Sequence, residues 1–290
     1  MKNPECVLKS GSLLGEGALW DPAAEVLWWV DITDRMIHRY DPRLGSNQTW
    51  HTPSDIGSLA LRKSGGLIVA MGWGFFFFDP ASGGFELIAE PEAGILENRF
   101  NDGKPDRQGR FWAGTLHEGE SKPSGSLYRL DPDLSWEMLV SGVIASNALA
   151  FGAQSEVVYF GDSQRKTVWA FDFDADDGAL TNRRVFLSLG PKDGSPDGAA
   201  VDSDGCYWLA QPDAWCVTRY DPRGRRDIVI DLPVQRPTCV ALGGTDLKTL
   251  FITSARWGIS ERELAQQPLA GGLFAVTVDT PGLPDAAFDR

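Results

Sequence analysis

The chain has 290 residues, of which 42% are hydrophobic and 11% aromatic, so it carries enough apolar side chains for a sizeable core. Its formal net charge of −13 at pH 7 argues against nucleic acid and anionic membrane surfaces as partners, because both would repel it. No apolar run near the N-terminus has the length of a secretory signal, and no segment approaches the ~20 apolar residues that span a bilayer.

Six similar stretches recur along the chain at intervals of 41 to 50 residues. They begin at Glu16 (EGALWD), Gly57 (GSLALR), Asn101 (NDGKPD), Asn147 (NALAFG), Asp197 (DGAAVD) and Thr238 (TCVALG). Apart from NDGKPD, the stretches are largely apolar after their first residue, which is the pattern of a buried strand.

Two more strand-like runs follow each stretch. The second runs are 26–31, 66–70, 110–114, 157–161, 206–210 and 249–253, and the third runs are 37–41, 75–79, 127–131, 168–172, 217–221 and 273–276. Four of the third runs end in Asp-Pro, which stops a strand because proline cannot donate a hydrogen bond to the ladder. Fourth, outer strands are expected at Trp50, Phe85–Leu87, Trp136–Met138, Val185–Leu187 and Ile228–Ile230.

A repeat of roughly 40 to 50 residues with about four short strands is typical of a β-propeller blade. The 3.6-residue periodicity of a helical solenoid is missing, and the one helical segment is Ser260–Gln267, in which Ser260 and Glu263 can form a capping box. We therefore predict an all-β fold, a six-bladed β-propeller of four-stranded antiparallel blades that spans residues 1–290 as one domain. The last blade lacks a fourth strand, so either Glu5–Leu8 or the tail near Phe288 is expected to complete it.

The first residues of the six stretches form a column in which four members carry oxygen ligands: Glu16, Asn101, Asn147 and Asp197. The first strand of each propeller blade lines the central channel, so these side chains are expected to meet at one mouth of that channel. Carboxylate and amide oxygens suit one divalent cation, Ca²⁺ above all, with Mg²⁺, Mn²⁺, Zn²⁺ and Fe²⁺ as alternatives. The competing interpretation is that each residue merely begins a strand and makes turn hydrogen bonds.

Several longer motifs are shared with a known family. They are LGEGALW (14–20), RFNDGKPDRQGRFWAGT (99–115), GSLYRLD (125–131), SNALAF (146–151), PDGAAVD (196–202) and PLAGGLFAV (268–276). Over essentially the whole chain, the sequence resembles the gluconolactonase/regucalcin (senescence marker protein 30) family, and looks closest to its bacterial sugar lactonases.

The resemblance implies that Glu16, Asn147 and Asp197 bind one divalent metal. It also implies that Asn101 contacts substrate or a metal-bound water, and that Arg99 holds sugar hydroxyls or the ring oxygen. The family usually has glycine where this chain has Ala148. Alanine replaces glycine readily where φ is negative, so we expect a negative φ at Ala148.

The predicted activity is metal-dependent hydrolysis of sugar aldonolactones, of the xylono-, arabinono- or gluconolactone type, to the aldonic acid in sugar catabolism. Asp197 is the expected general base, because a carboxylate beside the metal can take a proton from the attacking water. Glu118 lies past the second strand of its blade, where a loop could bring it, or His117, to a substrate hydroxyl; a solvated loop residue is the alternative.

Three further residues have two interpretations each. Trp73 and Trp257 could stack on a sugar face or pack between blades. Strand alternation is expected to point Asp102 away from the channel, into a structural role.

Two other functions stay open at this level. A phosphotriesterase-like hydrolase on the same scaffold would use the same metal and water. A calcium-binding regulatory propeller would need no catalysis, because a fold does not fix a function. The expected partner is a small sugar lactone, and the chain is expected to be a monomer or a weak homo-oligomer. The four scattered cysteines, which form no CxxC pair, favour free thiols in the cytoplasm.

Overall fold

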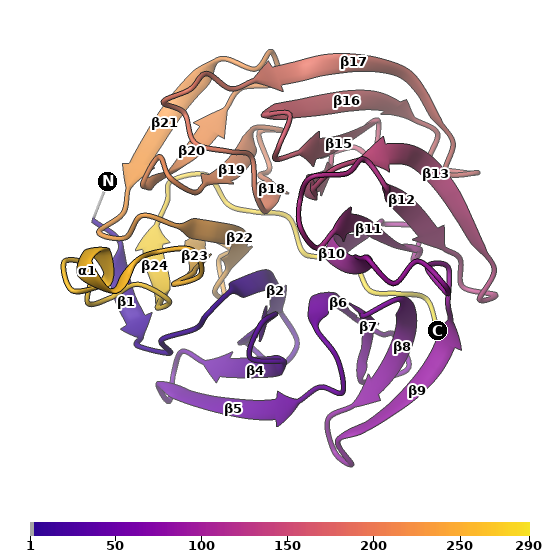
Figure 1. The fold of residues 1–290 in the computed structure, drawn as a ribbon, viewed down its shortest axis with the longest axis horizontal. Helices are drawn as coiled ribbons and strands as arrows, with labels where there is room; N and C mark the ends of the chain where they lie inside the picture. Colours follow the sequence, from indigo (N-terminus) through magenta and orange to yellow (C-terminus); the bar gives the residue numbers. More distant parts are fainter. Residues whose placement is uncertain (1–2) are drawn as a thin grey trace.

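The computed structural model describes residues 3–290, in which 24 strands form six four-stranded antiparallel sheets. Viewed down the shortest axis, the six sheets stand around a central opening (Figure 1). The predicted six-bladed β-propeller is confirmed.

Each of the first five blades runs outward from the channel in chain order. Blade 1 contains β2 (Gly15–Asp21), β3 (Val26–Asp31), β4 (Met36–Asp41) and β5 (Ser46–His51). Blade 2 contains β6 (Ile56–Leu61), β7 (Leu67–Met71), β8 (Gly74–Asp79) and β9 (Gly84–Ala89). Blade 3 contains β10 (Asn98–Pro105), β11 (Phe111–His117), β12 (Gly125–Leu130) and β13 (Trp136–Val143). Blade 4 contains β14 (Ser146–Phe151), β15 (Val157–Asp162), β16 (Thr167–Phe173) and β17 (Leu180–Ser188). Blade 5 contains β18 (Ala199–Val201), β19 (Tyr207–Gln211), β20 (Cys216–Tyr220) and β21 (Arg226–Asp231).

Blade 6 joins the two ends of the propeller. Its strands are β22 (Pro237–Gly243), β23 (Thr249–Ser254), β24 (Leu273–Thr277) and β1 (Glu5–Leu8). β1 pairs antiparallel with β24, with Glu5 opposite Ala275. Of the two sequence-based alternatives for this fourth strand, Glu5–Leu8 is therefore correct and the tail near Phe288 is not.

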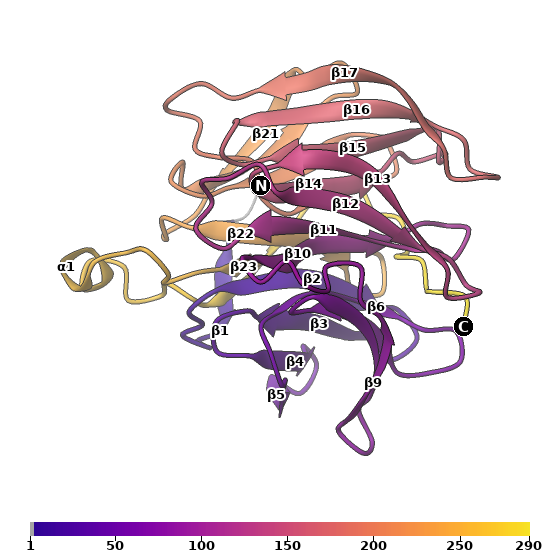
Figure 2. The same cartoon turned by 45° about the vertical axis from the view of Figure 1, so that its right-hand side comes forward.

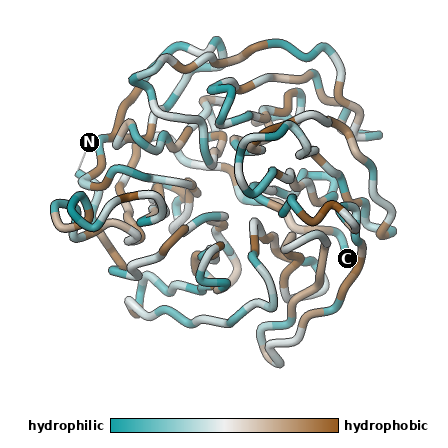
Figure 3. Tube along the Cα trace, viewed as in Figure 1, coloured by the Kyte–Doolittle hydropathy of each residue, from teal (hydrophilic) through white to brown (hydrophobic). Residues whose placement is uncertain are grey.

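Six clusters of buried apolar side chains hold the ring together, one between each pair of neighbouring blades. In the cluster between blades 2 and 3, the rings of Phe75 and Phe100 lie 4.8 Å apart. Between blades 6 and 1, Trp20 stacks on Phe251 at 5.5 Å. Hydrophobic stretches lie within the strands, whereas many connecting turns are hydrophilic (Figure 3). Sheet-to-sheet burial of apolar area is thus the main stabilising contribution.

The single helix of residues 3–290, α1 (Glu261–Leu264), lies between β23 and β24 and projects to one side (Figure 2). The predicted capping box of Ser260 and Glu263 is confirmed. The predicted length, Ser260–Gln267, is wrong. Gln267 N–H donates to the Leu264 carbonyl three residues back, which tightens the chain out of the α geometry just before Pro268. No helix of the described residues is long and apolar enough to cross a membrane.

The last twelve residues, 279–290, run past the central opening on their way to the C-terminus (Figure 1, yellow). The tail pairs with blade 5 through Asp202 and Gly282 and with blade 2 through Arg62 and Phe288. Phe288 is fully buried in the apolar cluster between blades 2 and 3. The tail therefore closes the channel at the end opposite to the column residues.

Candidate metal centre at the channel mouth

Irregular pairing interrupts five of the six innermost strands near their first residues. The register shifts lie between Glu16 and Leu19, Ile56 and Ser58, Phe100 and Gly103, Asn147 and Ala150, and Pro237 and Val240. In blade 5, β18 begins after Asp197, whose N–H still donates to the Ala210 carbonyl of β19. A bulge re-aims side chains that regular alternation would direct elsewhere. Five blades repeat this device around the axis.

The structure brings the four oxygen-bearing residues of the column to one cavity of about 550 Å³ at the channel mouth, here called the mouth cavity. Glu16, Asn101, Asn147 and Asp197 all line it, and so does Thr238. Gly57 does not, and a side chain there would collide with the backbone of Asn101 at about 2.5 Å.

The two amides of the column are fixed by hydrogen bonds. Asn101 Nδ2 donates to Asn147 Oδ1 at 2.9 Å and to the Ser146 carbonyl at 2.8 Å. Asn147 Nδ2 donates to Ser163 Oγ at 2.8 Å, and Ser163 donates in turn to the carbonyl of Pro196, next to Asp197. These bonds hold the Asn147 oxygen in place while leaving it acceptor capacity for a further partner.

The carboxyl groups of Glu16 and Asp197 are both buried in the lining of the mouth cavity, near enough for each to alter the pKa of the other. Burial raises the pKa of Glu16 to about 8, and the charge of Asp102 adds to this effect. Burial also raises the pKa of Asp197 well above its ordinary value, with the charge of Glu16 as the next cause. Two carboxyls that crowd together out of water share a proton unless a cation neutralises them.

The donor set fits one hard divalent cation. No group of three or more His, Cys, Asp or Glu side chains lies together as a metal site within residues 3–290. The carboxyl pair of Glu16 and Asp197 would therefore be completed by the amide oxygen of Asn147, which suits an oxygen-preferring ion. This arrangement leaves the cavity side open for water or another ligand.

Arg99 and Glu118 also line the mouth cavity. Arg99 Nη1 donates to Asn101 Oδ1 at 2.8 Å and to the Phe100 carbonyl at 2.9 Å. Removal from water lowers the pKa of Arg99, and the nearby carboxylates of Asp55 and Glu120 offset part of that effect. Glu118 is held in place by its backbone, whose N–H donates to the Glu97 carbonyl.

A sugar contact was one interpretation for two tryptophans and one histidine, and the structure places the three residues differently. Trp257 lines the mouth cavity and is half exposed. Trp73 lines a neighbouring cavity of about 390 Å³ and donates its indole N–H to Glu90 at 2.8 Å. His117 is buried beside Glu97 and lines neither cavity.

A family model described as "SMP-30/Gluconolactonase/LRE-like region" matches residues 14–256. The chain is 40% identical to the 6-deoxy-6-sulfogluconolactonase of Pseudomonas putida, over 98% of both proteins. It is 35% identical to the putative sugar lactone lactonase YvrE of Bacillus subtilis (strain 168), covering 96% of this chain and 95% of that protein. The chain belongs to the SMP-30/gluconolactonase/LRE-like family.

A solved structure agrees with this membership. The calcium-binding protein regucalcin from Agrobacterium tumefaciens superposes with a TM-score of 0.95 at 27% identity, covering 98% of this chain and 97% of that one. The family resemblance expected from the sequence motifs is confirmed.

One expectation about this family member's backbone is wrong. Ala148 has φ of +63°, not a negative value, because it occupies the bulge that follows Asn147. Asp102 also lies within a bulge. Its carboxylate accepts the Leu149 N–H of the next innermost strand at 2.8 Å and does not line the mouth cavity, which agrees with the structural role expected for it.

The same bulge position in blade 1 is occupied by Gly17, with φ of +59°. A methyl group at Gly17 would meet nothing closer than 3.4 Å, so Gly17→Ala tests backbone strain alone. We expect Gly17→Ala to lower the free energy of unfolding by about 1 kcal/mol, because left-handed φ costs a non-glycine residue roughly 1–2 kcal/mol. Ala148→Gly should change it by less than about 1 kcal/mol, because strain relief is offset by the lost buried methyl. Urea titrations of both variants would measure this, and equal losses for both would contradict it.

Several lining residues were missed when the sequence alone was considered. They are Asp55, Glu120, Ser163, Asp213 and Arg236. Glu120, Ser163 and Asp213 lie in turns that leave the second strand of their blades, as Glu118 does. An alignment of the residues that follow the second strand of each blade would have predicted these three.

Proposed function

We propose that this family member is a divalent-cation-dependent hydrolase that opens sugar aldonolactones to aldonic acids. The observation that carries the proposal is the buried carboxyl pair of Glu16 and Asp197 beside the Asn147 amide, at the base of a polar cavity of about 550 Å³. Relatives named as lactonases over nearly the whole chain support the reaction class.

Glu16, Asn147 and Asp197 would hold the cation, with Ca²⁺ favoured by the oxygen-only donor set and by a structural neighbour described as calcium-binding. When bound, such an ion polarises a carbonyl and acidifies water. Mg²⁺, Mn²⁺, Zn²⁺ and Fe²⁺ remain alternatives, because each accepts carboxylate oxygen.

The protein's own side chains transfer the proton and orient the substrate. Asp197 takes the proton of the water that attacks the lactone carbonyl. As the carbonyl carbon–ring oxygen bond breaks, that proton passes to the departing ring oxygen, which becomes a hydroxyl of the aldonate. Arg99 and Asn101 orient the lactone from one side, and Glu118 accepts a hydrogen bond from a sugar hydroxyl.

The experiment is a pH-indicator assay on xylono-, arabinono- and gluconolactone, run on metal-stripped protein and after each cation is restored. Cation-restored turnover well above spontaneous opening is expected. A phosphotriester in the same panel tests the phosphotriesterase alternative. Calorimetric Ca²⁺ binding without turnover of any lactone would instead favour a regulatory propeller.

The identity of the sugar is the remaining question. One relative is named for a sulfonated gluconolactone and another for a sugar lactone without further description. Both charged and uncharged lactones are therefore candidates by similarity alone.

A further inference from the structure

We propose, on the basis of the lactonase function above, that the mouth cavity selects uncharged sugar lactones and discriminates against lactones that carry a sulfonate or phosphate at the far carbon. The property that decides this is the charge of the residues around the cavity. It is a property of the whole lining and does not depend on one pose of the substrate.

Carboxylates dominate the lining of the mouth cavity. They are Glu16, Asp55, Glu118, Glu120, Asp197 and Asp213, against two guanidiniums, Arg99 and Arg236. A divalent cation would neutralise the pair of Glu16 and Asp197. The four remaining carboxylates still outnumber the two guanidiniums. An anionic substituent would therefore enter a negative field.

Both arginines of the lining already have partners, Arg236 through two of its nitrogens and Arg99 through one. Arg236 pairs with Asp213, with Nε 3.2 Å from Oδ1, and donates through Nη1 to the Trp257 carbonyl at 2.8 Å. Arg99 donates through Nη1 to Asn101 and to a backbone carbonyl. Recognition of a sulfonate or phosphate favours a guanidinium fork free for two parallel hydrogen bonds, and engaging Arg236 in that way would compete with its contacts. Arg99 keeps its Nε and Nη2 donors outside these contacts, but the charges of Asp55, Glu120 and Glu118 already act on its guanidinium.

Glu118 and Glu120 carry the excess negative charge. Within residues 3–290, neither has a Lys, Arg or His nitrogen within 4 Å of its carboxylate. Glu120 accepts a hydrogen bond from the side-chain amide of Gln164, which leaves its charge in place. Ionised carboxylates only accept hydrogen bonds, so they suit sugar hydroxyls and repel a second anion.

The size of the mouth cavity makes this repulsion unavoidable. A volume of about 550 Å³ corresponds to roughly 10 Å across, close to the Debye length of about 8 Å at physiological ionic strength. A charged group near the middle of the cavity therefore lies within about one Debye length of the lining carboxylates, so screening of its repulsion by Glu118 and Glu120 is incomplete. The Arg35–Asp55 ion pair, at 2.7 Å, neutralises one carboxylate at the rim but adds no free positive charge.

The experiment compares three lactones with the cation-loaded enzyme: gluconolactone, its 6-deoxy-6-sulfo derivative and the uncharged 6-deoxy-6-methylsulfonyl derivative of similar bulk. We expect kcat/KM for the sulfonated lactone to be about tenfold or more below that for the methylsulfonyl lactone. Raising the salt concentration should narrow this gap, because screening acts on the charged substrate alone.

A variant locates the effect. Glu120→Gln keeps the shape of the side chain and removes its charge, so the ratio of kcat/KM for the sulfonated over the methylsulfonyl lactone should rise about threefold. Glu86→Gln, the same change on an exposed outer strand, should leave that ratio unchanged.

Each outcome has a distinct meaning. Equal or faster hydrolysis of the sulfonated lactone would overturn charge selection while leaving the lactonase function intact. If kcat/KM is equally low for the sulfonated and the methylsulfonyl lactone at every salt concentration, the selection is steric, and charge selection would also be overturned. Failure to open any of the three lactones, together with failure on xylono- and arabinonolactone, would instead refute the lactonase function itself.

Discussion

Replacing Asp197 with asparagine is expected to lower kcat/KM for lactone opening by roughly 10³-fold or more. The variant loses both the proposed base, a contribution of about 10²- to 10⁴-fold, and one of two charged cation ligands. Spontaneous opening must be subtracted from every measured rate. Asp246→Asn, an equivalent change in an exposed turn, should retain wild-type activity.

A second measurement on the same variant separates chemistry from folding. Asparagine removes one charge from the buried pair with Glu16, so the cation-free variant should unfold at a higher temperature than the cation-free wild type. Added Ca²⁺ should raise the unfolding temperature of the wild type and not of the variant. Near wild-type turnover in Asp197→Asn, with a normal response to Ca²⁺, would show that Asp197 is neither base nor ligand.

Withdrawing the cation is expected to abolish turnover and to make stability depend on pH in an unusual direction. In the folded, cation-free protein the pKa of Glu16 is raised to about 8 and that of Asp197 is raised as well, whereas both titrate near 4 when unfolded. The folded state therefore binds more protons between about pH 4 and pH 8, so its free energy of unfolding falls as pH rises through that window. The expected loss is on the order of a few kcal/mol.

Restoring the cation should remove this loss, because it favours the ionised pair. The difference in stability between cation-loaded and metal-stripped protein is thus expected to grow from pH 5 to pH 9. Denaturant titrations at pH 5, 7 and 9, with and without Ca²⁺, would measure it. A metal-stripped protein whose stability is constant or rises over this range would contradict the proposed pair.

The sequence predicted the blade count, the strand positions and the meeting of the four oxygen-bearing column residues at one cavity, because strand runs and turn residues repeat at a regular interval. The same repeat did not predict the bulges. At Ala148 the ordinary φ preference of a non-glycine residue predicted a negative φ, and the bulge reversed that expectation. A bulge depends on how neighbouring strands pair, which a single strand's residues do not encode locally.

The sequence also did not predict which turn residues line the mouth cavity. Asp213 and Arg236 reach the mouth cavity from different blades, and only the closed ring brings them together. Glu118 was found because it directly follows the second strand of its blade. The electrostatic character of the cavity is therefore a tertiary property, visible only when all six blades are assembled.

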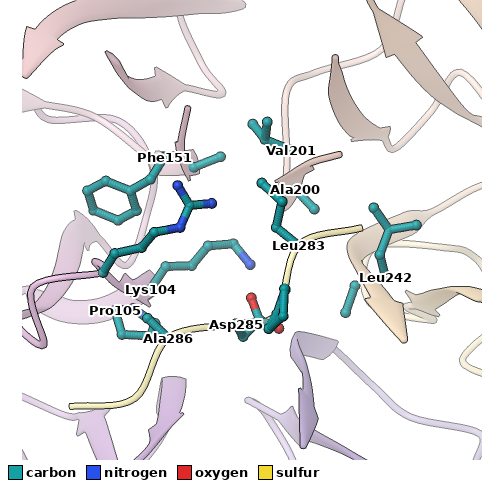
Figure 4. A pocket seen from close by; sticks show the side chains of 13 residues that line it. Lys104, Pro105, Phe151, Ala200, Val201, Leu242, Leu283, Asp285 and Ala286 are labelled. Carbon is teal, nitrogen blue, oxygen red and sulfur yellow. The ribbon is translucent and has the colours of Figure 1, made fainter. Parts of the chain in front are cut away.

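The tail that closes the channel at the end opposite to the mouth cavity has a kinetic consequence. There Leu283, Asp285 and Ala286 of the tail meet the strand end that carries Lys104, whose side chain extends toward Asp285 (Figure 4), and only about 60 Å³ of free space is left among them. The Asp285 carboxylate also accepts the Trp20 N–H at 3.3 Å, which ties the tail to blade 1. Because the channel is closed at that end, substrate and product must both pass through the open side of the mouth cavity. Each product acid must therefore leave past the carboxylates of the mouth cavity before the next lactone can enter.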